Sequence, residues 1–318
     1  MFNKLKNFFS TKKTAEEASI DLSLGYSRLN AFRNRLKQEA YQDFENEYGQ
    51  LEWDAKTLLN EGIGLDVACA GMIEAWVKAR PGSYIAQLFA GVSKTCLAWA
   101  ARTAVAGASV SEARAEQFIS LLGEASDHLG KADTINPEDP EICARMIRVC
   151  TGLSAESEIA SGYFQAATEL EPNHLMAHLM MISYLSPKWL GSIDEMHEFA
   201  NRQYAESDNN LLAVLPLIAI TEEWVYYGMM GEKTKYKNYF ANEALLNTVT
   251  ELYEAFEEPE EGALLTPWVY NYFAFLFYKF NQKDLAKKII RSLDGKMTVY
   301  PWAYLDITSN TALQKLAG

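Results

Sequence analysis

Two histidines, His174 and His178, have a spacing that suits metal chemistry. A separation of four residues places both imidazoles on one face of a helix, where they could bind zinc with His197 or Glu195 as a third ligand. The HExxH pattern of zinc hydrolases is absent, because Leu175 and not a glutamate follows the first histidine. Histidines on a helix more often pack or form hydrogen bonds. We therefore expect no metal and no cofactor, and keep His174, His178 and His197 as the alternative.

Neighbouring carboxylates, Glu222–Glu223 and Glu257–Glu258, are the second candidates for chemistry. Sequence neighbours on a helix point in different directions, so neither pair forms a catalytic dyad by itself. The sequence also lacks the phosphate-binding GxGxxG and GxxxxGK[ST] loops, the GxSxG motif of hydrolases and the kinase motifs. We therefore assign no catalytic residue and predict a protein that is not an enzyme.

The composition indicates a soluble, folded protein with an acidic surface. Of its 318 residues, 49% are hydrophobic and 22% are charged, and the net charge is -13. Such a surface repels the phosphate backbone of nucleic acids and attracts basic partners. The four cysteines have no CxxC spacing, which indicates reduced thiols and a cytoplasmic location. The N-terminal segment has no apolar run long enough for a signal peptide or a membrane span, and residues 1–15 are expected to form a flexible basic tail. Residues 211–227 are too short and too charged for a membrane helix, so we expect no membrane span.

Apolar residues at helical spacing predict helices along most of the chain. We expect one long helix over residues 21–49, a helix rich in alanine and glycine over 84–105, a buried apolar helix over 211–227 and an aromatic helix over 268–280. Residues 228–237 are expected to be a loop, and residues 297–308 a terminal strand or coil. These patterns together predict an all-α protein.

A repeat of 35 residues occupies the middle of the chain. A small–large–small–proline pattern occurs twice, at Ala125, Leu129, Ala132 and Pro137, then at Ala160, Phe164, Ala167 and Pro172. Alanines suit the line where two helices touch, and proline ends a helix before the next begins. The spacing is close to the roughly 34 residues of tetratricopeptide units. Residues 116–200 resemble that family, which implies a tetratricopeptide-like stack of antiparallel helical hairpins, or α-solenoid.

The repeat suggests a division of the chain into four parts. They are the basic tail (1–15), an N-terminal helical region (16–110), the tetratricopeptide-like repeats (111–207) and C-terminal helical hairpins (208–318). We expect the helical parts to pack as one continuous solenoid.

A turn between two amphipathic helices carries a second resemblance. Pro187 disfavours helix before it, Gly191 permits unusual backbone angles, and Ser192 can cap the helix that follows. The stretch is similar to a family of bacterial proteins of unknown function with a Pro-Lys-Trp-x-Gly-Ser turn. The matching positions are His178, Pro187, Lys188, Trp189, Gly191, Ser192 and Phe199, with Arg80-Pro81, Ala98-Trp99 and Arg102 upstream. Because that family has no established activity, the resemblance supports a fold and implies no chemistry.

Helical solenoids expose long surfaces that suit protein partners, so we expect a protein–protein interaction module. The charge suggests an immunity or antitoxin-like protein that occludes a basic toxin domain. The alternatives are a scaffold or regulator of a secretion or stress system, and an enzyme or sensor with a metal site at the three histidines. The residues expected to contact the partner are Lys188, Trp189, Ser192, Trp268, Tyr272, Glu257 and Glu258.

Overall fold

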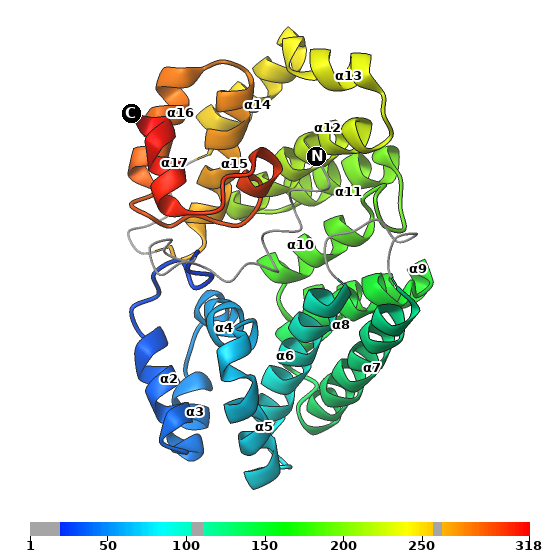
Figure 1. Ribbon diagram of the computed structural model, residues 1–318, viewed down its shortest axis with the longest axis vertical. Helices are drawn as coiled ribbons and strands as arrows, with labels where there is room; N and C mark the ends of the chain where they lie inside the picture. The colour runs from blue at the N-terminus through cyan, green and yellow to red at the C-terminus, as the bar shows by residue number, and fades with distance from the viewer. Residues whose placement is uncertain (1–19, 103–110, 257–262) are drawn as a thin grey trace. The chain divides into compact units, whose positions relative to one another are not determined.

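The computed structural model describes residues 20–102, 111–256 and 263–318, and its regular structure in these ranges is entirely helical (Figure 1). These described ranges hold sixteen α-helices, α2 to α17, and no strand. Helices that follow one another pack as pairs, such as α6 with α7 and α8 with α9. The prediction of an all-α stack of helical hairpins is thus confirmed.

The chain divides into two compact units, which we describe separately. Among the described residues, unit 1 is Gly25–Tyr184, and unit 2 is residues 20–24 with Leu185–Gly318. The division after Tyr184 falls inside the expected repeat region 111–207. It follows from the packing of α10 on α8 and α9, and of α11 on α12.

Unit 1 is built around α8, which is buried along most of its length. The elements of unit 1 are α2 (Leu29–Lys37), α3 (Tyr41–Tyr48), α4 (Trp53–Leu59), the π-helix η1 (Asn60–Gly64), the 3-10 helix η2 (Val67–Cys69), α5 (Ala70–Ala79), α6 (Tyr84–Arg102), α7 (Glu112–Ile135), α8 (Pro140–Leu153), α9 (Ser157–Leu170) and α10 (Leu175–Tyr184). Helix α8 packs against α7, α9 and α10.

The repeat alanines lie where the sequence places them. Ala125 and Ala132 of α7, and Ala160 and Ala167 of α9, are fully buried. Helix α7 also lies very close to α6 at Gly91. A Cβ added at this glycine would lie only 2.5 Å from a side-chain carbon of Leu129. Small residues therefore set the spacing between neighbouring helices, as expected.

The single long helix expected over residues 21–49 is wrong. Helix α2 ends at Lys37, Glu39 has a left-handed φ of 57°, and α3 begins at Tyr41. The break turns the chain so that Phe32 and Phe44 pack edge to face, with ring centroids 4.8 Å apart. Both rings are fully buried in the core of unit 1, so burial of two aromatic side chains outweighs the continuity of one helix.

Unit 2 contains the second set of helices. Its elements are α11 (Ile193–Glu206), η4 (Asn210–Ala213), α12 (Val214–Met229), α13 (Lys233–Asn238), η5 (Tyr239–Ala241), α14 (Glu243–Ala255), α15 (Thr266–Lys279), α16 (Lys283–Ser292), η6 (Trp302–Leu305) and α17 (Asn310–Ala317). Ser192 caps α11 as expected, because its hydroxyl accepts a hydrogen bond from the Glu195 amide. The loop expected over residues 228–237 is wrong, because α13 begins at Lys233 and continues to Asn238. The segment 297–308, expected to be a strand or coil, is coil and turn around the short helix η6.

Helix α12 belongs to the core of unit 2. Within the described residues, Asn210–Met229 is the one helical stretch long and apolar enough to cross a membrane. Its most apolar window is 78% buried inside the protein, and α12 packs against α11 and α15.

Candidate functional site

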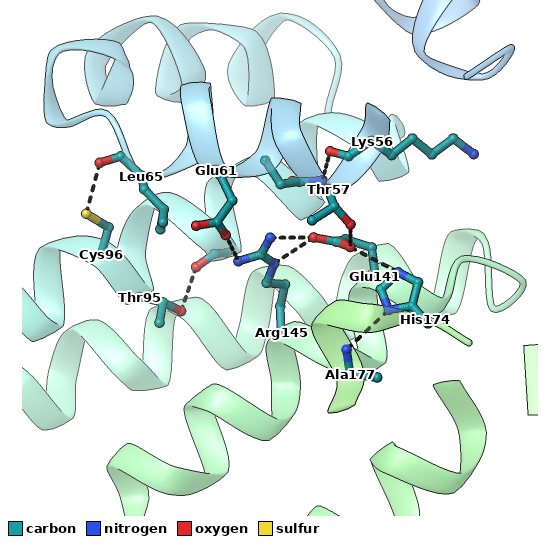
Figure 2. Close-up of polar contacts among 12 residues, drawn as sticks. Lys56, Thr57, Glu61, Leu65, Thr95, Cys96, Glu141, Arg145, His174 and Ala177 are labelled. Atoms are coloured by element: carbon teal, nitrogen blue, oxygen red, sulfur yellow. Dashed lines mark hydrogen bonds and ion pairs between the residues drawn. The ribbon is translucent and has the colours of Figure 1, made fainter. Parts of the chain in front are cut away.

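A buried polar network in unit 1 gathers the ionisable groups that could do chemistry (Figure 2). It starts at the first turn of α8, where the Asp139 carboxylate accepts a hydrogen bond of 3.0 Å from the Glu141 amide and caps the helix. Pro140 occupies the first helical position, which needs no amide hydrogen. This local pattern orients Glu141 and, one turn later, Arg145 towards the interior.

Arg145 links α8 to the π-helix η1. Its guanidinium donates to Glu141 Oε1 at 2.8 Å and 2.5 Å, and to Glu61 Oε1 at 2.6 Å. The Arg145 side chain is 7% exposed, Glu61 is 12% exposed and Glu141 is fully buried. One cation therefore neutralises carboxylates from two separate segments of the chain.

Glu141 also joins α4 and the start of α10. Its Oε2 accepts a hydrogen bond of 3.0 Å from the Thr57 hydroxyl and lies 3.1 Å from His174 Nε2. The other ring nitrogen of His174, Nδ1, accepts a hydrogen bond of 3.3 Å from the Ala177 amide. His174 therefore links the Glu141 carboxylate to the first turn of α10. As Figure 2 shows, the carboxylate of Glu141 lies between Arg145 on one side and His174 on the other.

The pKa values of two carboxyls at the start of α8, Asp139 and Glu141, are shifted in opposite directions. Burial raises the pKa of Glu141, but Arg145 and His174 outweigh that effect and hold it at about 2. Burial and the charge of Glu141 raise the pKa of Asp139 to about 6, against a smaller opposing effect of Lys56. The Lys56 ammonium lies 3.7 Å from the centroid of the Trp53 ring, and in Figure 2 its side chain extends away from Glu141 and Arg145.

Such a divergence of pKa values is also found in acid–base active sites. Here, however, Asp139, Glu141 and His174 are each at most 3% exposed, so the network presents no open acid or base to a substrate. Its direct effect is structural: it fixes α4 and η1 against α8 and the start of α10. The face of α8 that carries Glu141 and Arg145 is therefore covered by the protein's own chain.

The three histidines of the metal alternative have separate protein partners. His174 faces Glu141, and His178 Nδ1 donates to the His174 carbonyl at 3.0 Å in the first turn of α10. In unit 2, His197 Nε2 lies 2.9 Å from Glu223 Oε2. Among the residues that the structure describes, no group of three or more His, Cys, Asp or Glu side chains is placed to hold a metal ion.

Lys188, one of the residues expected to contact a partner, belongs to a polar cluster of unit 2. Its ammonium lies 2.7 Å from Glu222 Oε2 and donates to the Tyr304 hydroxyl at 3.1 Å. Tyr304 in turn donates to Glu222 Oε1 at 2.5 Å. Glu222 is 8% exposed, so Lys188 neutralises a buried carboxylate and ties the Pro187–Gly191 turn to α12 and η6.

The other residues expected to contact a partner differ in how far they are buried. Tyr272 of α15 is 8% exposed, and a buried side chain does not offer the contact expected of it. Ser192 is half-buried and exchanges hydrogen bonds with Glu195. Trp189 and Trp268 are half-buried. Glu257 and Glu258 lie outside the described residues, as does the basic tail 1–15.

The comparison with known families covers the part of unit 1 that holds most of the buried network. Residues 23–155 match a family model described as "Domain of unknown function (DUF4034)". The match includes Thr57, Glu61, Glu141 and Arg145, and ends before His174. No curated protein and no solved structure matches the chain. The similarity implies no activity, and the resemblance of the Pro187–Ser192 turn to a bacterial family stays a prediction.

Sequence reasoning missed the network although one signal was present. Glu141 and Arg145 stand four residues apart in a segment that is otherwise mostly apolar. Oppositely charged residues at that spacing share a helix face. In a helix buried all round, such a pair must find further polar partners. The identity of those partners, Thr57, Glu61 and His174, depends on the fold.

Proposed function

We propose that this protein is a non-enzymatic binding module for a basic protein partner. In the bacterial setting that the turn resemblance implies, the partner is a basic toxin domain, and the protein occludes it in the cytoplasm as an immunity or antitoxin-like protein. The proposal requires an accessible surface of one charge sign, and it requires no reactive group.

The observation that carries the proposal is a long stretch without a basic residue. Residues 149–187, between Arg148 and Lys188, contain no lysine or arginine. The stretch contains four glutamates, of which three are exposed and one is half-buried: Glu156, Glu158, Glu169 and Glu171. A surface of one sign raises the rate at which an oppositely charged partner docks.

The closed network in unit 1 favours binding over catalysis. Asp139, Glu141 and Arg145, whose pKa values are shifted within this network, are buried inside unit 1. The glutamates of the stretch 149–187, in contrast, lie at or near the surface. A partner would therefore approach the outer helices of unit 1, because the inner face of α8 is already covered.

Capture of a partner from the native cell tests this function. The tagged full-length protein is recovered at 0.1 M and 0.5 M NaCl, and co-purifying proteins are identified and their stoichiometry measured. We expect one stoichiometric basic protein whose affinity falls about tenfold over this salt range, because exposed charges are screened. A toxin-like gene adjacent to that of this chain would identify it as an immunity protein.

Two results would overturn the proposal. One is the absence of any stoichiometric partner at either salt concentration. The other is a partner whose affinity does not depend on salt, since that complex would owe nothing to the acidic surface. A partner drawn from a secretion or stress system would support binding but replace the toxin with a regulatory target.

A further inference from the structure

Helix α9 carries an apolar stripe on its exposed side. Ile159, Tyr163, Ala166 and Leu170 follow one another at i, i+4, i+7 and i+11, which places them on one face of the helix. Ile159 is 49% exposed and Leu170 is 42% exposed, while Tyr163 and Ala166 between them are half-buried. Large apolar side chains in a row at a helix surface are typical of a contact with another helix.

The face of α9 next to the stripe already has its contacts. Ala160 and Ala167 are fully buried, and α9 packs against α8 and α10 within unit 1. Tyr163 of the stripe packs partly against the core of unit 1. Ile159 and Leu170 at its two ends therefore extend the apolar surface of α9 beyond the face that holds the helix in the unit.

Acidic side chains lie along one side of the stripe. Glu158 and Glu169 are exposed eleven residues apart, and Gln165 between them donates to Glu169 Oε1 at 2.8 Å. The sequence of α9 contains no lysine or arginine. A partner helix that covered the stripe would face carboxylates along its edge, which a basic helix would neutralise.

Gly162 leaves room beside the stripe. A Cβ added at this position would meet no atom within 4 Å. Another helix can approach α9 closely there, because no side chain holds it away. The helix has 14 residues and is about 21 Å long at 1.5 Å per residue, which matches four turns of a partner helix.

We infer that the exposed stripe of α9 is the docking face for a basic amphipathic helix of the protein partner. This inference rests on the proposed function and locates its surface. A second copy of the chain is disfavoured as the occupant, because two α9 faces would bring glutamates against glutamates. An anionic membrane is disfavoured for the same reason.

A designed peptide tests the docking face directly. The probe is an 18-residue helical peptide with leucine at i, i+4, i+7 and i+11, and lysine and alanine elsewhere. One control peptide has the same composition in scrambled order, and a second has glutamate in place of lysine. Binding to the full-length protein is measured by fluorescence anisotropy, and hydrogen exchange shows which amides the probe protects.

We expect the probe to bind, with protection at residues 157–170, and the two control peptides to bind at least tenfold more weakly. We expect at least tenfold weaker binding of the probe to the double variant Ile159→Ser/Leu170→Ser, and likewise to the blocking variant Gly162→Phe. Glu158→Gln/Glu169→Gln should reduce the salt dependence. All these positions are exposed, so the variants should fold, and circular dichroism checks that they do.

Matched variants on α7 serve as controls. Ile119 is 58% exposed and Glu116 is exposed on α7, so Ile119→Ser and Glu116→Gln make the same chemical changes outside α9. They should alter probe affinity less than twofold. Equal effects of the α7 and α9 variants, or equal binding of the scrambled peptide, would overturn the inference.

The inference and the proposed function fail in different ways. A native partner captured equally by the wild type and by Ile159→Ser/Leu170→Ser would leave the function standing and overturn the docking face. Stripe-dependent binding of the probe without any native partner would support the docking face and contradict the proposed function. Self-association that the double variant abolishes would make a second copy the occupant and overturn the inference.

Discussion

Arg145 of α8 donates a hydrogen bond of 2.6 Å to Glu61 of the π-helix η1, although 84 positions separate the two residues in the chain. The same guanidinium also holds Glu141, its neighbour one turn earlier. Together these contacts let unit 1 bury two carboxylates that would otherwise be costly to remove from water.

Replacement of Arg145 by methionine should strongly destabilise unit 1. It leaves Glu61 and Glu141 buried without their cation, and we expect a loss of about 3–5 kcal/mol in the free energy of unfolding. Urea titration measures this loss in the free energy of unfolding, and hydrogen exchange of the α8 amides shows whether it falls on unit 1. Arg202→Ala, which removes an exposed pair with Glu198 at 4.0 Å, should change stability by less than about 0.5 kcal/mol. Similar effects of both variants would contradict the assigned role of the network.

Asp139 should make unit 1 less stable at neutral pH than it is in weak acid. Its pKa is raised from 3.8 to about 6 in the folded protein, so the folded state binds this proton more tightly than the unfolded state. The resulting stabilisation is complete below about pH 4 and is lost as the pH rises through 6.

Asp139→Asn tests this pH dependence, because asparagine keeps the helix cap without the charge. We expect the variant to be more stable than the wild type by about 1–3 kcal/mol at pH 7.5. The difference should shrink as the pH is lowered towards 4, in urea titrations at matched ionic strength. A gain of the same size at both pH values would show that Asp139 does not titrate between them.

Lys188→Ala should act on the stability of unit 2 and not on partner affinity. The substitution leaves Glu222 buried beside Tyr304 without its cation, and we expect a loss of about 1–3 kcal/mol. Lys235→Ala, which removes a more exposed pair with Glu232 at 2.8 Å, serves as the control and should be nearly neutral. A Lys188→Ala protein of unchanged stability that loses the native partner would restore Lys188 as a contact residue.

Two glycine substitutions should have opposite effects. Gly91→Ala places a Cβ 2.5 Å from Leu129 at the α6–α7 contact, and overpacking of this kind costs about 1–3 kcal/mol. Gly123→Ala on α7 meets nothing within 4 Å and should stabilise the helix by about 0.5–1 kcal/mol. Thermal unfolding of both variants checks the pair. Stabilisation by Gly91→Ala would mean that α6 and α7 do not approach as closely as described.

The sequence alone determined the helical character of the chain and several local features. Apolar spacing is a local property, and it predicted α6, α12 and α15. The recurring alanines marked the buried faces of α7 and α9, because a small side chain is needed where two helices touch. Ser192 was identified as a helix cap because capping depends on a hydroxyl and an amide three residues away.

Only the tertiary structure decided which polar residues meet and which side chains are buried. The contact of Arg145 with Glu61 depends on how α4 and η1 fold back onto α8, and residue spacing carries no such information. Lys188 and Tyr272 fit an exposed surface by residue type, yet the packing of unit 2 uses both internally. The break at Glu39 arises because Phe32 and Phe44 gain more by packing on each other than one continuous helix would allow. Distant segments compete for burial in one core, and that competition is decided in three dimensions.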